Sequence, residues 1–167
     1  MKVLIVSDNH GHAEVLRQIK ARHQDEVDLF IHCGDSEMPY ASDEMKGFYA
    51  VRGNCDFDDD YPQQLTKEFP NNRLFATHGH LYQVKSSLLP LKYAAEEKEA
   101  NIVCFGHSHI AGVELLEGIL FINPGSIELP RMTRNKTYAI LDTNDTCYFV
   151  HYYNEKGEKL SSHTFEK

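Results

Sequence analysis

The segment Val3-Leu4-Ile5-Val6-Ser7-Asp8-Asn9-His10 joins four consecutive apolar residues directly to a run of polar ones. A short apolar run rich in β-branched residues predicts a strand that is buried on both faces, as the strands of parallel sheets are. The polar run then falls at the carboxyl end of that strand, where loops of α/β proteins present functional side chains. This one segment therefore predicts both the kind of sheet and the place of a site.

Five later segments repeat the pattern of a short apolar run followed by polar residues or glycine. They are Leu29 to Ile31, Phe48 to Val51, Leu74 to Ala76, Ile102 to Phe105 and Leu120 to Ile122. Between the first two strands, His12–His23 carries apolar residues at helical spacing, and Lys85–Ala100 repeats that spacing. Pro90 should bend or delay this second helix, because proline cannot donate a backbone hydrogen bond.

After residue 110 the pattern changes from alternating strands and helices to strand after strand. Gly112–Leu116 and Ile119–Asn123 flank Glu117-Gly118, which is typical of a hairpin. Three more strand candidates follow: Tyr138–Leu141, Cys147–Tyr153 and Lys159–Phe165. We therefore expect an α/β fold of two packed mixed β-sheets flanked by helices, formed as a single domain over residues 1–167.

The composition excludes several broad classes of protein. Hydrophobic residues make up 41% of the 167 residues, which argues against a disordered or low-complexity chain. The formal charge of −8 disfavours a general affinity for nucleic acid or anionic lipid. No apolar run approaches the ~20 residues that span a bilayer, and the N-terminus lacks the pattern of a signal peptide, so we expect a cytoplasmic protein without membrane contact.

Residues that can bind metal recur at the ends of the predicted strands. Six of the ten histidines form three His-x-His pairs: His10 with His12, His78 with His80, and His107 with His109. Asp8, Asp35 and Asn54 occupy the same kind of position after their own strands. A single such residue has little meaning, but independent accidents at five strand ends are not expected. The pattern indicates one shared site built of nitrogen and oxygen ligands.

At these residues the sequence resembles the calcineurin-like metallophosphoesterases, and in particular their compact phosphodiesterase branch. The resemblance covers about residues 1–126 and rests on five blocks that stand in the family's order. The blocks are Asp8-Asn9-His10, Gly34-Asp35, Gly53-Asn54-Cys55-Asp56, His78 in Thr77-His78-Gly79-His80, and Gly106-His107-Ser108-His109, followed by Asn123-Pro124-Gly125-Ser126. Five blocks in order make a far more specific signal than any one of them alone.

The resemblance implies a centre of two divalent metal ions. One ion would be held by Asp8, His10, Asp35 and His109, and the other by Asn54, His78, His107 and the shared Asp35. Imidazole and oxygen ligands together suit Mn, Fe, Zn or Ni rather than Ca. We expect manganese, with Ni, Fe, Zn and Mg as alternatives. A hydroxide that bridges the ions would attack phosphorus, which makes Asp35 and Asn54 catalytic by the same resemblance.

The sequence departs from the family pattern at Cys55, where many members carry a histidine that protonates the leaving oxygen. A thiol is a weaker match to that task at pH 7. His80 is our first candidate for the missing proton donor, and the alternative is a substrate whose leaving group needs little protonation. The acidic run Asp56, Asp58, Asp59 and Asp60 is interpreted as a solvated loop.

The predicted function is hydrolysis of a small phosphodiester or nucleotide-like substrate. Two alternatives from other classes stay open: a non-catalytic metal-binding scaffold for partner proteins, as in a retromer subunit that resembles this branch, and a metal-dependent nuclease. Retention of all seven ligand residues argues against the scaffold, and the charge of −8 argues against the nuclease. A homo-oligomer is compatible with the sequence.

Overall fold

The first of two β-sheets is built around β1 (Lys2–Val6) in the computed structural model, which describes residues 1–167. β1 pairs in parallel with β2 (Leu29–His32) on one side and antiparallel with β9 (Thr137–Thr143) on the other. The sheet has the order β11-β10-β9-β1-β2-β3. Its remaining strands are β3 (Phe48–Ala50), β10 (Cys147–Asn154) and β11 (Lys159–Glu166).

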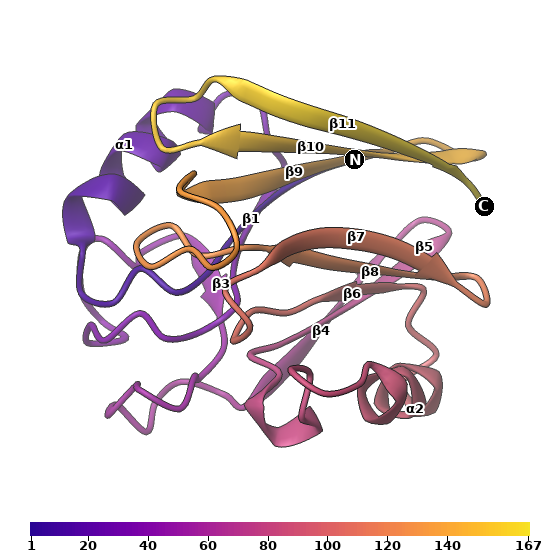
Figure 1. Ribbon diagram of the computed structural model, residues 1–167, viewed down its shortest axis with the longest axis horizontal. Coiled ribbons are helices and arrows are strands. Elements are labelled where there is room, and N and C mark those ends of the chain that lie inside the picture. The colour runs from indigo at the N-terminus through magenta and orange to yellow at the C-terminus, as the bar shows by residue number, and fades with distance from the viewer.

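The second sheet has the order β4-β5-β6-β8-β7 and lies against the first (Figure 1). Its strands are β4 (Gln64–Phe69), β5 (Asn72–Thr77), β6 (Ile102–Cys104), β7 (Ala111–Leu116) and β8 (Ile119–Pro124). Parallel and antiparallel pairs occur in both sheets. The predicted fold class, two packed mixed sheets with helices outside, is therefore confirmed.

The two sheets and the helices bury three layers of apolar side chains. Between the sheets lies a core of 17 buried residues, to which β1 contributes Val3 and Ile5. The other face of β1 carries Leu4 and Val6, which belong to a second core under α1 (Ala13–His23). A third core lies under α2 (Leu89–Glu97), on the outer face of the second sheet. β1 is thus buried on both faces, as its apolar run predicts.

Sequence reasoning differs from the structure at two elements. The second helix begins at Leu89 with Pro90 in its first turn, so the proline delays the helix predicted from Lys85, and a short 3-10 helix, η1 (His80–Tyr82), precedes it. β4 was not predicted, because Gln64-Leu65-Thr66-Lys67-Glu68-Phe69 has no apolar run. It lies at an edge of its sheet and pairs only with β5, so half of its residues stay exposed.

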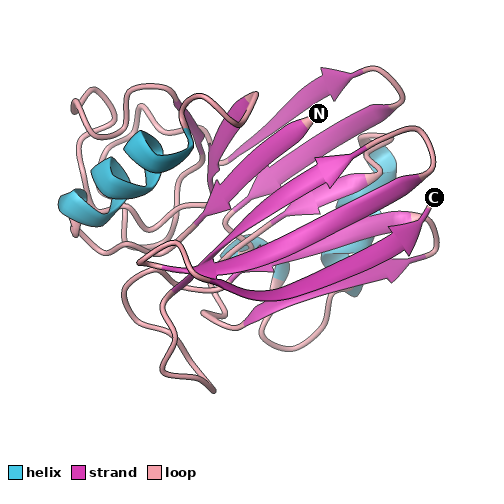
Figure 2. Cartoon of the chain, turned by 90° about the horizontal axis from the view of Figure 1, so that it is seen from above, coloured by secondary structure: helices cyan, strands magenta, loops and turns pink.

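The residues that follow the strands lie at one end of the molecule. Figure 2 shows the longer loops gathered at one end of the sheets, on the same side as α1. Backbone hydrogen bonds join these loops across strands: the Asp8 N–H donates to Gly34 O at 3.0 Å, and the Gly106 N–H donates to His78 O at 3.0 Å. Neither helix is long and apolar enough to cross a membrane.

Candidate metal centre

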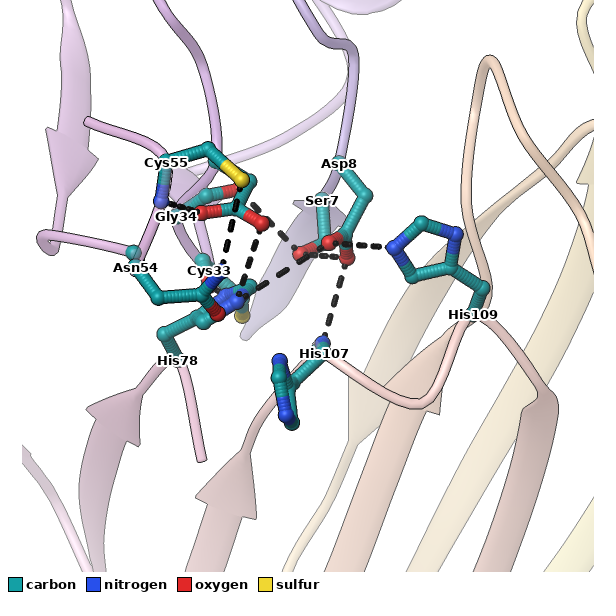
Figure 3. Close-up of polar contacts among 12 residues, drawn as sticks. Ser7, Asp8, Cys33, Gly34, Asn54, Cys55, His78, His107 and His109 are labelled. Atoms are coloured by element: carbon teal, nitrogen blue, oxygen red, sulfur yellow. Dashed lines mark hydrogen bonds and ion pairs between the residues drawn. The ribbon is translucent and has the colours of Figure 1, made fainter. Parts of the chain in front are cut away.

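Four of the predicted ligands form a group that we call the first cluster: Asp8, His10, Asp35 and His109. One potential ligand atom of each lies within 4.8 Å of those of the other three. His109 Nε2 lies 3.1 Å from Asp8 Oδ1, and His10 Nε2 lies 3.5 Å from His109 Nε2 (Figure 3 shows Asp8 and His109). These residues follow β1, β2 and β6, so two sheets contribute to one cluster.

The second nitrogen of each histidine in the first cluster is already occupied. His10 Nδ1 lies 2.6 Å from Glu37 Oε1, and His109 Nδ1 donates to the Leu129 carbonyl at 2.7 Å. Such contacts fix the ring orientation and direct Nε2 toward the other members of the cluster, which is how metal-binding histidines are usually held. Glu37 was missed by sequence reasoning, since nothing in its local sequence marks it.

The other predicted ligands, Asn54, His78 and His107, form a second cluster next to Asp35. His78 Nε2 lies 3.3 Å from Asp35 Oδ2, and its Nδ1 donates to the Cys33 carbonyl at 2.7 Å. The His78 and His107 ring centroids are 5.0 Å apart. Asn54 is held less firmly: it is exposed, and its amide donates to Cys55 Sγ at 3.3 Å. The structure thus brings the two histidines together and leaves Asn54 on the rim.

Two buried polar atoms at the junction of the clusters have no hydrogen-bond partner. They are Asp8 Oδ1 and His78 Nε2, which lie 4.0 Å apart. His109 Nε2 lies 3.1 Å from Asp8 Oδ1, and His78 Nε2 lies 3.3 Å from Asp35 Oδ2, but neither contact has the geometry of a hydrogen bond. An unpartnered buried polar atom costs roughly 1–3 kcal/mol, so such a pair needs a ligand. A carboxylate oxygen and an imidazole nitrogen are both good ligands for a divalent metal ion, and the site fits one.

The electrostatics of the centre follow from burial and from the pairing of opposite charges. Burial would raise the pKa of Asp35, but His78 and the Cys55 backbone N–H outweigh it and hold the pKa well below its usual value. Burial would likewise lower the pKa of His78, yet Asp35 and Asp8 raise it. Asp8 raises the pKa of His109. Burial, His78 and Lys85 lower the pKa of His107 to about 4.

The backbone at the centre is held in an uncommon conformation. Of the eleven residues other than glycine with positive φ, six lie here: Asp8, His10, Asp35, Glu37, His107 and His109. Left-handed backbone at such residues costs roughly 1 kcal/mol or more, and it concentrates at functional sites. Gly53 shows how crowded the loops are, because a Cβ there would collide with the Asp35 carboxylate.

Asp56 corrects the interpretation of the acidic run as a solvated loop. Asp58, Asp59 and Asp60 are exposed or half-buried, but Asp56 is only 5% exposed. Its carboxylate accepts hydrogen bonds from the backbone N–H of Asp35 (2.8 Å), Gly53 (2.7 Å) and Glu37 (2.7 Å), and from Ser36 Oγ at 2.9 Å. Asp56 therefore ties the loop after β2 to the loop after β3.

The candidate proton donors lie beside the second cluster. The His80 ring is 5.4 Å from that of His78 and 6.1 Å from that of His107, and its buried Nδ1 has no partner. Burial and the neighbouring His78 lower the pKa of His80. Burial, followed by the Asp35 carboxylate, raises the pKa of Cys55 to about 11, so the thiol is a poor acid at neutral pH.

Comparison with known proteins agrees with this geometry. Residues 1–146 match the model of the calcineurin-like phosphoesterase superfamily domain. A probable metallophosphoesterase of Bacillus subtilis is 47% identical over 160 residues, covering 96% of this chain and 95% of the relative. A phosphodiesterase of Methanocaldococcus jannaschii is 28% identical over 170 residues, covering 89% of this chain and 96% of that protein.

Solved structures give the same result at the level of the fold. A protein of Streptococcus pneumoniae, described as a predicted phosphoesterase, superposes with a TM-score of 0.96 at 34% identity and covers 99% of this chain and 97% of its own. Vacuolar protein sorting 29 of Cryptosporidium parvum shares the fold alone, with a TM-score of 0.80 at 18% identity and coverage of 99% and 98%. The resemblance in the sequence is therefore confirmed, and this chain belongs to the calcineurin-like phosphoesterase superfamily.

Proposed function

We propose that this protein hydrolyses small phosphodiesters with the help of two divalent metal ions, manganese being preferred. Asp8, His10, Asp35 and His109 would hold one ion, and Asn54, His78 and His107 the other, with Asp35 shared. The observation that carries the proposal is the pair of buried, unpartnered atoms Asp8 Oδ1 and His78 Nε2, which lie 4.0 Å apart next to Asp35. When bound, two such ions supply an activated water as nucleophile and positive charge for the phosphoryl oxygens.

The chain's own residues would keep the site attractive to an anion. Only two of the seven proposed ligands, Asp8 and Asp35, are carboxylates, and Glu37 adds a third negative charge nearby. The two ions would bring +4, which balances these three carboxylates and one metal-bound hydroxide. A phosphodiester would then meet a centre that does not repel it, although the whole chain carries −8.

Proton supply to the leaving oxygen distinguishes classes of ester. Hydrolysis breaks the bond between phosphorus and the leaving oxygen, which must then gain a proton or depart as an anion. His80 is the proposed donor, but its lowered pKa leaves a small protonated fraction at pH 7. Diesters with a good leaving group suit such a site best. The name of the Methanocaldococcus relative, a phosphodiesterase, supports a diester as the substrate.

Two other functions make different demands on the chain. A scaffold for partner proteins would not need seven ligand-type residues or strained loops to hold them. A nuclease would be hindered by the acidic surface. Incubation with single- and double-stranded DNA at several salt concentrations tests the nuclease, which requires cleavage at low salt that falls as salt rises.

One panel of assays tests the proposed function. The protein is purified, its metal content is measured, and it is then stripped with a chelator. Hydrolysis of p-nitrophenyl phosphate and bis(p-nitrophenyl) phosphate is followed after addition of Mn, Ni, Zn or Mg. We expect about two ions per chain and a diesterase rate above the monoesterase rate, with Mn the best activator. Absence of metal uptake, or equal activity in the stripped protein, contradicts the proposal.

A further inference from the structure

A cavity of about 540 Å³ adjoins the metal centre and is used by nothing described above. Ser108, which stands between His107 and His109, lines it, as does Asn123. The Asn123 amide donates to Ser108 Oγ at 2.9 Å and to the Gly106 carbonyl at 3.0 Å. These hydrogen bonds join the wall of the cavity to the loop that carries His107 and His109. A group in this cavity would lie next to an ester held at the metal centre.

The floor of the cavity is apolar. Val84, Phe105 and Phe121 line it, and all three belong to the core under α2 with less than 10% of their surface exposed. A volume of this size suits a ring system of the dimensions of a nucleoside, since small-molecule pockets span roughly 300–1,000 Å³. Because Phe105 and Phe121 are almost fully covered, they offer the ligand an apolar surface and little ring face for stacking.

The charged side chains at the cavity are two cations and one anion. Lys85 and Arg131 are exposed, and neither side chain makes an ion pair or a hydrogen bond within the protein. Glu114 on β7 is the only carboxylate among the 13 lining residues. Arg131 lies beside the centre, because its backbone N–H donates to the His109 carbonyl at 3.0 Å, and Lys85 lines the same cavity as Ser108. Two unpaired cations beside an apolar floor match a ring that carries an anionic group.

We propose that this cavity binds one ester substituent of the diester, that the apolar floor holds its ring, and that Lys85 and Arg131 bind a second phosphate on it. The inference rests on the proposed function and names its substrate class: nucleoside-type phosphodiesters that carry an additional phosphate. Glu114 then faces the uncharged edge of the substituent, where hydroxyl or amino groups donate to it.

The test compares two esters that differ by a single phosphate. They are the p-nitrophenyl ester of thymidine 5′-phosphate and the same ester with a 3′-phosphate, both assayed on the manganese-loaded protein. We expect the 3′-phosphate to raise kcat/KM about tenfold, as a charge-assisted contact does. Lys85→Gln and Arg131→Gln should each reduce that gain, and Lys156→Gln, an exposed lysine in the turn between β10 and β11, should leave it intact.

The possible outcomes distinguish failure of the proposed hydrolysis from failure of the proposed second-phosphate site. If the manganese-loaded protein hydrolyses neither ester nor bis(p-nitrophenyl) phosphate, the proposed function fails, and binding decides the cavity: thymidine 3′,5′-bisphosphate should bind more tightly than thymidine 5′-phosphate, with the difference lost in the Lys85→Gln, Arg131→Gln double variant. If both esters are hydrolysed at equal rates, or the variants slow both equally, the second-phosphate site is overturned. Gly112→Trp, at a lining position where a Cβ meets no atom within 4 Å, should fill the cavity and raise KM for both nucleoside esters more than for methyl p-nitrophenyl phosphate.

Discussion

The first cluster and the second cluster meet at Asp35 but differ in how firmly the fold holds their side chains. In the first cluster both imidazoles are fixed from behind, by Glu37 and by the Leu129 carbonyl. In the second, His78 is buried and fixed, but Asn54 is exposed and bonded to Cys55. A preformed set of ligands binds without the cost of ordering side chains. We therefore expect one tight and one weaker metal site.

The largest effect is expected from replacing Asp35, the residue that we propose to hold both ions. Asp35→Asn should abolish hydrolysis, by roughly 10³-fold or more, because the loss of a shared carboxylate removes several kcal/mol of transition-state stabilisation. Steady-state kinetics and metal content measure the effect. Asp145→Asn, an exposed carboxylate in the turn between β9 and β10, is the matched control and should behave as the unaltered protein. Activity within tenfold in the Asp35 variant would contradict a shared ligand.

Glu37→Gln should weaken the first cluster alone. Glu37 lies against His10 Nδ1, and loss of such a partner lowers metal affinity by roughly 10–100-fold. A competition titration with a fluorescent chelator should then show the tight site weakened and the weaker site unchanged. Glu97→Gln on α2, which makes no ion pair, serves as the control. Equal weakening of both sites would mean that the two clusters bind metal as one unit.

Asn54→Asp tests whether the second cluster needs a neutral ligand for turnover. A carboxylate there should bind metal at least as tightly as the amide, since it adds a negative charge. The same charge should lower turnover about tenfold, because it reduces the attraction for an anionic ester. Metal titration and kcat on bis(p-nitrophenyl) phosphate are measured together. Tighter binding with an unchanged kcat would show that the neutral ligand has no catalytic value.

Cys55→His tests whether the second cluster lacks a proton donor. The thiol has a pKa of about 11 and lies on the loop of Asn54. A histidine there should speed hydrolysis of diesters with poor leaving groups by up to about tenfold, and p-nitrophenyl esters much less, because only a poor leaving group needs the proton. Cys55→Ala controls for loss of the thiol. An equal change for both classes of ester would weaken the argument that general acid catalysis is missing.

The sequence predicts the parts of this molecule that depend on local pattern. Apolar runs identify the buried strands, and the residues after them identify where Asp8, Asp35 and His78 gather. β4 escapes prediction because an edge strand needs only one partner and no apolar run. Asp56 and Glu37 escape for another reason. Their role arises from hydrogen bonds between loops that are about twenty residues or more apart in the chain, and such contacts exist only once the sheets have formed.

The smallest expected effect is the dependence of metal-free stability on pH. His78 and His109 have raised pKa values, so their stabilisation is complete below about pH 6.5 and is lost as the pH rises through their values in the folded protein. His32 and His107, whose pKa values are about 4, have the opposite effect on stability, and their contribution is lost as the pH falls below about 6.5.

Stability in the presence of a chelator should therefore be greatest near pH 6.5. Thermal unfolding should show Tm falling from pH 6.5 towards pH 8.5, and His109→Gln should flatten that limb of the curve. With manganese the limb should reverse, because protons and metal compete for the same nitrogens. A Tm that rises from pH 6.5 to 8.5 without metal would mean that neither histidine is stabilised by its neighbouring carboxylate, Asp35 for His78 and Asp8 for His109.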